Sequence, residues 1–197
     1  MIGNWKDRIL IYYTSLNYGF TTIEILTVLP LLSLVILLIF SSVSSNIYSI
    51  RKIDSELEMQ QQAQLILDFL ESKIIESTGV SYLQDNKGFQ KHNTNERVYI
   101  SRIIFKNHPE RSDKGYIFSL TKDSQYEYYN LKYGVGLAGG ATNELGNFID
   151  GIEVEPIPID KKYTEANGIN IKIDFKMDGN TLTFENSYYF RNSNRGH

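Results

Sequence analysis

The chain has 197 residues, a formal net charge of −3 and no cysteine. This length accommodates one modest domain besides a membrane segment. Because nonspecific phosphate binding relies on an excess of Lys and Arg, the acidic balance argues against nucleic acid as a primary ligand. The lack of cysteine excludes disulfide bonds, so the fold must be stabilised by its own packing or by neighbouring subunits.

The most informative segment is residues 19–50, in which Gly19-Phe20-Thr21-Thr22-Ile23-Glu24 precedes a long uncharged run. No charged residue lies between Ile25 and Ile50, and most of these 26 positions are Leu, Ile or Val. Since a bilayer requires about 20 apolar helical residues, the segment predicts a transmembrane helix. A carboxylate within such a span costs at least about 2.5 kcal/mol to insert, so Glu24 is expected to have a partner or a role. The span itself offers no basic residue.

A free amino terminus could supply the missing cation. If the chain were cut after Gly19, the new ammonium would lie on Phe20, four residues before Glu24. A neighbouring copy could then pair its ammonium with this carboxylate, because neither charge is tolerated alone in lipid. Such a pair would set the axial register between subunits.

Gly19, Phe20, Glu24 and the apolar run resemble the amino-terminal signature of type IV pilins and pseudopilins. The resemblance implies that residues 1–19 are a leader peptide, which a membrane-embedded prepilin peptidase removes before it methylates Phe20. It also implies that Glu24 serves assembly and that residues 20–45 form a transmembrane helix that becomes the fibre core. The implied partners are the peptidase, other pilin or pseudopilin subunits, an inner-membrane assembly platform and, before extraction, the lipid bilayer.

Two other interpretations compete for this segment. An ordinary signal anchor explains its length and hydrophobicity but not the Gly-Phe-x-x-x-Glu spacing. A secretory signal peptide could be cut at Ser42-Val43-Ser44, yet its apolar region would exceed the usual length of about 7 to 15 residues and would begin with an acid.

The orientation of the span does not follow from its flanking charges. Lys6 and Arg8 precede it while Arg51 and Lys52 follow it, so the positive-inside rule favours neither direction. The family resemblance alone places the amino terminus in the cytoplasm before processing, with later transfer to a fibre at the cell surface.

Residues 46–78 are predicted to continue as an amphipathic helix. Gly79 provides a stop signal after this helix. Within the membrane span, Pro30 lacks the N–H that would bond the carbonyl of Leu26, which predicts a kink or a melted turn near Leu26 to Leu29. The apolar stripe of the amphipathic part recurs at three- and four-residue spacing: Met59, Ala63, Ile66, Leu70 and Ile74.

Residues 79–197 are predicted to form a globular domain built on an antiparallel sheet. Asp178-Gly179 has the composition of a hairpin turn that leads into a strand from Thr181 to Phe190. Further strands are expected near residues 98–103, 116–120, 126–133 and 149–159. The fold class is therefore α+β, with the stripe of the long helix covering the packed face of the sheet. The clearest strand alternates with polar residues: Ile169, Ile171, Ile173, Phe175 and Met177.

One glycine-rich segment, Gly134 to Gly139, fits the G-x-G-x-x-G spelling of a dinucleotide site. That site requires a helix directly after the last glycine, so that backbone N–H groups meet the pyrophosphate. Residues 140–146 form a poor helix with Gly at both ends, and no βαβ pattern surrounds them. A turn between strands is the favoured interpretation.

Other motifs predict no enzyme, no metal site and no cofactor. His92, His108 and His197 share no metal-ligand spacing and are expected to be solvated. Ser and His residues are not arranged with an acid in any nucleophile motif. The only candidates for calcium are acidic residues that lack a regular ligand loop and are expected to be solvated: Asp150, Glu153, Glu155 and Asp160.

A cluster of tyrosines remains: Tyr126, Tyr128, Tyr129 and Tyr133. Aromatic platforms can stack on sugars or bases, which would make an adhesive or DNA-uptake surface. Tyrosine is also common in strands for packing reasons, and core or cross-strand packing is the favoured interpretation here.

The sequence thus predicts a minor pilin or pseudopilin, a structural subunit of a type IV pilus-like fibre. The order of elements over residues 96–190 resembles PilW-type minor pilins and J-type minor pseudopilins of type II secretion, which implies a place in a tip or priming complex. Motility, DNA uptake, adhesion and secretion machines all fit this resemblance. The alternative is a signal-anchored extracellular binding module that never polymerises.

Overall fold

The computed structural model describes residues 21–107, 115–125, 127–136 and 139–191. They form one long helix, α2 (Thr22–Ile75), followed by seven strands. The chain divides into two compact units, residues 1–50 and 51–197, with the boundary inside α2. The predicted α+β class is confirmed.

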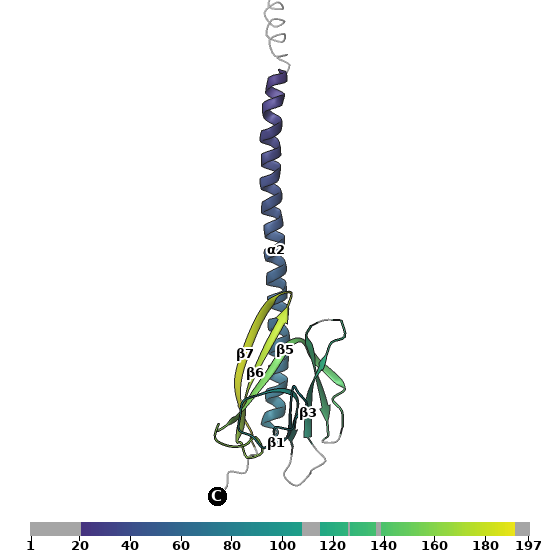
Figure 1. The fold of residues 1–197 in the computed structure, drawn as a ribbon, viewed down its shortest axis with the longest axis vertical. Helices are drawn as coiled ribbons and strands as arrows, with labels where there is room; N and C mark the ends of the chain where they lie inside the picture. The colour runs from purple at the N-terminus through teal and green to yellow at the C-terminus, as the bar shows by residue number, and fades with distance from the viewer. Residues whose placement is uncertain (1–20, 108–114, 126, 137–138, 192–197) are drawn as a thin grey trace, which may run out of the picture. The chain divides into compact units, whose positions relative to one another are not determined.

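The strands form one antiparallel sheet in the order β1 to β7, shown in the lower part of Figure 1. Strand β2 pairs with β3 through Arg102–Lys106 and with β5 through Val98 and Tyr99. The β3–β4 hairpin therefore occupies the part of β2 that β5 leaves free. The strands are β1 (Gly79–Asp85), β2 (Val98–Lys106), β3 (Gly115–Lys122), β4 (Tyr129–Val135), β5 (Asn143–Ile157), β6 (Gly168–Met177) and β7 (Asn180–Tyr189).

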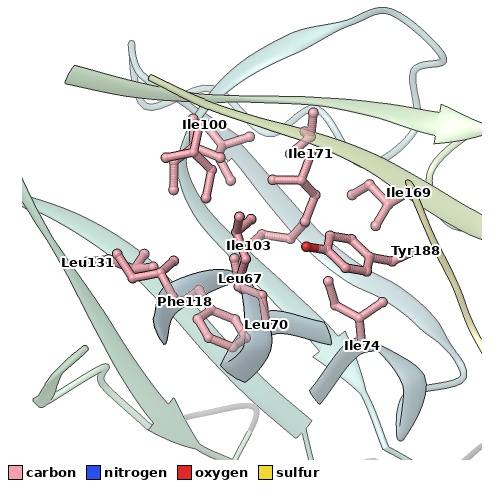
Figure 2. Packing of buried hydrophobic residues seen from close by; sticks show 14 of the residues in the cluster. Leu67, Leu70, Ile74, Ile100, Ile103, Phe118, Leu131, Ile169, Ile171 and Tyr188 are labelled. Atoms are coloured by element: carbon pink, nitrogen blue, oxygen red, sulfur yellow. The ribbon is translucent and has the colours of Figure 1, made fainter. Parts of the chain in front are cut away.

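The core of the second unit lies between the sheet and the carboxy-terminal part of α2. The predicted stripe is fully or almost fully buried: Met59, Ala63, Ile66, Leu70 and Ile74. Figure 2 shows Leu70 and Ile74 of this stripe among side chains from the strands, including Phe118, Leu131 and Ile171. The prediction that the helix covers the packed face of the sheet is confirmed.

The last hairpin is also confirmed. The predicted inward residues Ile169, Ile171 and Ile173 are at most 2% exposed, as the period-two pattern requires. Asp178 and Gly179 connect β6 to β7 with φ angles of 51° and 79°. Positive φ at both central residues is the conformation of a type I′ turn, whose twist matches that of the two paired strands. Asp and Gly both tolerate positive φ, which explains the Asp-Gly sequence.

The prediction of one packed and one wet face is wrong for part of the sheet. Ile104 and Ile117 pair across β2 and β3 and are buried, although they belong to the face opposite the main core. Gly140, which follows β4, lies over this face beside Gly134, the partner of Ile117 in the sheet. Its carbonyl oxygen is so close that a Cβ atom on Gly134 would collide with it. The segment after β4 is held there by Arg102, whose Nη2 donates to the Gly139 carbonyl at 3.0 Å.

Two expectations for the helix are also corrected. The helix is unbroken through Pro30, so the expected melted turn near Leu26 to Leu29 is wrong, while the kink stays a prediction. The loss of one hydrogen bond does not end this Leu-rich helix. At its other end α2 stops at Ile75, and Gly79 begins β1 instead of capping the helix. The Ser77 hydroxyl donates to the Lys73 carbonyl at 2.6 Å and thereby satisfies one of the last helical carbonyls.

Candidate assembly site at the start of the long helix

Glu24 lies in the first turn of α2 and forms a capping box with Thr21. The Thr21 backbone N–H donates to Glu24 Oε2 at 2.8 Å, and the Thr21 hydroxyl donates to the same oxygen at 2.9 Å. In return, the Glu24 N–H donates to Thr21 Oγ1 at 3.4 Å. Residues of these types, three positions apart before an apolar run, satisfy the free N–H groups at a helix start.

This capping role was missed from the sequence, although Thr21-Thr22-Ile23-Glu24 contains the signal. A cap of this kind stabilises the first turn of a helix. It does not neutralise the carboxylate, because both donors are neutral groups. Within the residues that the structure describes, Glu24 forms no ion pair, and Oε1 accepts no hydrogen bond. A cation from another molecule could therefore bind without displacing the cap.

The predicted cleavage site lies outside the described residues. Gly19 and Phe20 both precede Thr21, the first residue that the structure describes. Cleavage after Gly19 and methylation of Phe20 therefore stay predictions.

The helix that follows Glu24 presents apolar side chains on all sides. All side chains from Thr22 to Ile50 are exposed in the single chain, with Leu37 at 67% and Phe40 at 71%. In the described part of the chain, α2 is the one helix long and apolar enough to cross a membrane. An apolar surface of this extent needs lipid or other protein chains to cover it.

Comparison with known proteins leaves the family open. No family model, curated protein or solved structure matches the chain. The assignment of a function therefore depends on the residues at the start of α2 and on the physical chemistry of a carboxylate in an apolar span.

The described tyrosines of the cluster contribute to packing, in agreement with the favoured interpretation. The Tyr133 ring lies 4.8 Å from the Phe69 ring of α2 and 5.5 Å from the Phe118 ring of β3, measured between centroids. Tyr128 packs edge-on against Phe148 at 5.0 Å. Tyr129 is half-buried beside the same core, and Tyr126 lies outside the described residues.

The acidic residues near the end of β5 are not simply solvated. Arg97 lies 2.9 Å from Glu155, 3.6 Å from Glu153 and 4.0 Å from Glu185. The hydrogen bond and charge of Glu155, followed by the charge of Glu153, raise the pKa of the Arg97 guanidinium. Arg97 directly precedes β2, Glu153 and Glu155 belong to β5, and Glu185 belongs to β7, so the spacing of the sequence does not indicate the cluster. Among the described residues, no group of three or more His, Cys, Asp or Glu is arranged to hold a metal ion.

The glycine-rich segment does not lead into a helix. Gly134 lies within β4, Gly136 takes a φ of 98° after it, and β5 begins at Asn143. The segment therefore connects two antiparallel strands, which confirms the turn interpretation except that the turn begins later than expected. Of the histidines, His92 stacks on Tyr82 with centroids 5.9 Å apart, while residues 108 and 197 lie outside the described part.

Proposed function

We propose that the chain is a minor pilin or pseudopilin, a structural subunit of a type IV pilus-like fibre assembled from the membrane. The observation that carries this proposal is Glu24. It is an exposed carboxylate without a cationic partner in the described residues, and 26 uncharged positions follow it. Gly19 and Phe20 precede it at the spacing that the pilin family uses for processing. A long helix followed by an antiparallel sheet is compatible with this role.

In this proposal, cleavage between Gly19 and Phe20 creates the cation that Glu24 lacks. Each subunit offers the ammonium of Phe20 to the Glu24 carboxylate of a neighbour. The attraction is strong where water is excluded, and a charge left there without its partner would be strongly destabilising, so each charge requires the other. The Thr21 cap holds the carboxylate at the start of the helix, so the ion pair fixes how far one helix is displaced along the next.

The protein would be a single-pass protein of the cytoplasmic membrane, with its amino terminus in the cytoplasm, until it is extracted into the fibre. The likeness to PilW-type and J-type minor subunits supports a place in a tip or priming complex. Its direct partners would then be the prepilin peptidase, the assembly platform and other subunits.

One observation favours the alternative of a signal-anchored binding module that does not polymerise. The capping box gives Glu24 a role within its own helix, so no neighbour is needed to explain its presence. A plain anchor predicts that the mature protein retains Met1 and is made normally in cells without a prepilin peptidase.

Two variants of Glu24 separate capping from charge pairing. Glu24→Gln keeps an oxygen that accepts the Thr21 bonds but removes the charge, whereas Glu24→Ala removes both. We expect both variants to be inserted and cleaved, and both to be depleted from the sheared fibre fraction relative to the membrane fraction. Gly19→Ala should instead leave the precursor uncleaved, which provides a control for processing.

The outcomes distinguish the two roles. If Glu24→Gln enters fibres as the unaltered protein does while Glu24→Ala does not, the carboxylate acts as a cap and the charge-pairing mechanism is refuted. If both variants enter fibres normally, Glu24 has no role in assembly.

A further inference from the structure

The two edge strands of the sheet differ in how they are protected. Strand β1 pairs with β2 through two register shifts, one between Val80 and Tyr82 and one between Gln84 and Asp85. The chain then folds back along its outer side, where the Lys91 N–H donates to the Leu83 carbonyl at 2.8 Å. Bulges and covering loops are devices by which proteins prevent an edge from pairing with another strand. The edge at β1 is therefore interrupted by bulges and is closed by the chain itself near Leu83 to Asp85.

Strand β7 has none of these devices. It pairs with β6 over ten consecutive positions, from Asn180 to Tyr189, without a register shift. This stretch contains no Pro, Lys or Arg. In the part of the chain that the structure describes, no other strand pairs with β7. A long, regular edge of this kind is a template for an additional strand.

The phase of the ladder identifies which backbone groups are free for pairing. The Phe190 N–H donates to the Asn167 carbonyl at 2.9 Å, one position beyond the last ladder pair. Because hydrogen-bonded and non-hydrogen-bonded pairs alternate in an antiparallel ladder, every second residue from Phe190 backwards is bonded to β6. The intervening residues direct their N–H and C=O groups to the open edge: Thr181, Thr183, Glu185, Ser187 and Tyr189.

A groove of about 370 Å³ runs beside this edge, between β7 and α2. Its apolar lining includes Leu67 of the helix and Phe184 of the strand, and Asp68 and Glu71 provide carboxylates on the helix side. Neither carboxylate forms an ion pair with any described residue. Their charges reach the strand: the pKa of the Tyr188 phenol is raised mainly by burial and further by Glu71 and Asp68.

From the open backbone of β7 and the acidic groove beside it, we propose that this edge binds an extended, basic segment of a partner protein as an added strand. Main-chain hydrogen bonds to β7 would provide affinity, and alternate Lys or Arg side chains would reach Asp68 and Glu71. The proposal goes beyond the fibre function and does not depend on it.

Charge argues against a second copy as the occupant. Two β7 strands pairing with each other would bring Glu185, Asp68 and Glu71 of both copies to one interface. The other edge strand, Gly79–Asp85, contains no Lys or Arg that could complement these acids. The structure therefore assigns the edge to a different protein that carries positive charge.

Binding of synthetic peptides to the full chain in detergent tests this assignment. The probe is a fluorescent ten-residue peptide of alternating Val and Lys. One control replaces Lys with Glu, and another carries N-methyl groups on alternate residues, which block strand pairing without changing charge. We expect the basic peptide to bind and both controls to bind at least about tenfold more weakly, because each lacks one of the two recognition elements.

Variants of the protein test the groove itself. Asp68→Asn combined with Glu71→Gln should weaken binding of the basic peptide about threefold to tenfold, as two exposed charge pairs contribute modestly. Asp54→Asn combined with Glu58→Gln makes the same change of charge on the same helix outside the groove, and should leave binding unchanged.

Four outcomes would overturn the proposal. The first is equal binding of the N-methylated peptide, and the second is unchanged binding to the Asp68→Asn, Glu71→Gln variant. The third comes from a chain that ends after Arg191: if the basic peptide binds only to this shortened form, the chain's own last residues occupy the edge. Absence of binding to both forms has the same consequence.

Discussion

At Gly146 the sheet lies so close to α2 that no room remains for a Cβ atom, and a methyl group there should destabilise the domain. A Cβ atom on this residue of β5 would lie 2.6 Å from Cδ1 of Ile66 and 2.9 Å from Oε1 of Gln62. Ile66 is fully buried, so it cannot move aside freely. Overpacking of this kind costs about 1 to 3 kcal/mol. We expect Gly146→Ala to lower the free energy of unfolding by this amount.

A second substitution tests whether the collision is the cause. Ile66→Val removes the Cδ1 atom that the new methyl group would meet, and by itself costs about 0.5 to 1.5 kcal/mol. The Gln62 oxygen is the end of a flexible side chain and can turn away. In the double variant the two changes compensate each other, so their combined cost should be smaller than the sum by at least about 0.5 kcal/mol.

Gly151→Ala is the matched control in the same strand. Its Cβ atom would lie 3.5 Å from the Tyr99 ring, an ordinary contact, so we expect a change within about 0.5 kcal/mol. Urea unfolding of the full chain in detergent, followed by the near-ultraviolet circular dichroism of the tyrosines, measures the four variants and the unaltered chain. If Gly146→Ala is as stable as the unaltered chain, or if the double variant is additive, the close approach of α2 to β5 is refuted.

Two further predictions concern buried tyrosines. The hydroxyl of Tyr163, a fully buried residue, lies 2.7 Å from the Val154 carbonyl oxygen and 2.9 Å from that of Glu96. Tyr163→Phe leaves these acceptors without their donor and should cost about 1 to 3 kcal/mol in the same unfolding assay; an unchanged midpoint would contradict this. The Tyr116 hydroxyl donates to Glu76 and holds the pKa of that carboxyl below its ordinary value of 4.5. A lowered folded-state pKa stabilises the protein above pH 4.5 and loses this contribution as the pH falls through the folded-state value. Stability of Tyr116→Phe should therefore depend less on acid than that of the unaltered chain, and equal dependence would exclude this contact as the cause.

The elements that could be predicted from the sequence are those with local signals. The stripe from Met59 to Ile74 follows the helical period, and the alternation from Ile169 to Phe175 follows the strand period, so each states which face is buried. Asp178-Gly179 specifies its turn because both residues tolerate positive φ. These features do not depend on distant parts of the chain, and each was predicted in its correct place.

The features that were missed depend on contacts between distant residues. The pairing of β2 with both β3 and β5 and the close approach of Gly140 to Gly134 follow from the order of strands. The cluster around Arg97 joins a residue that precedes β2 to carboxylates of β5 and β7. No sequence window contains all of these groups.

At the candidate site, the Glu24 carboxylate has one role that is local and one proposed role that depends on another molecule. The Thr21 and Glu24 capping box has a local sequence signal, an acid three positions after a threonine, and it gives Glu24 a role besides the proposed one in assembly. Both roles use the same carboxylate, and only variants that separate charge from hydrogen bonding can divide them. Gly19 and Phe20 were predicted from the family resemblance, and their test lies in the chemistry of the amino terminus.

The amino terminus of the protein extracted from cell membranes tests the central claim most directly. Amino-terminal sequencing together with intact mass should show a chain that begins at Phe20 and carries one additional methyl group. A mature chain that still contains residues 1–19 would contradict the account, because the ammonium that is proposed to meet Glu24 would then not exist.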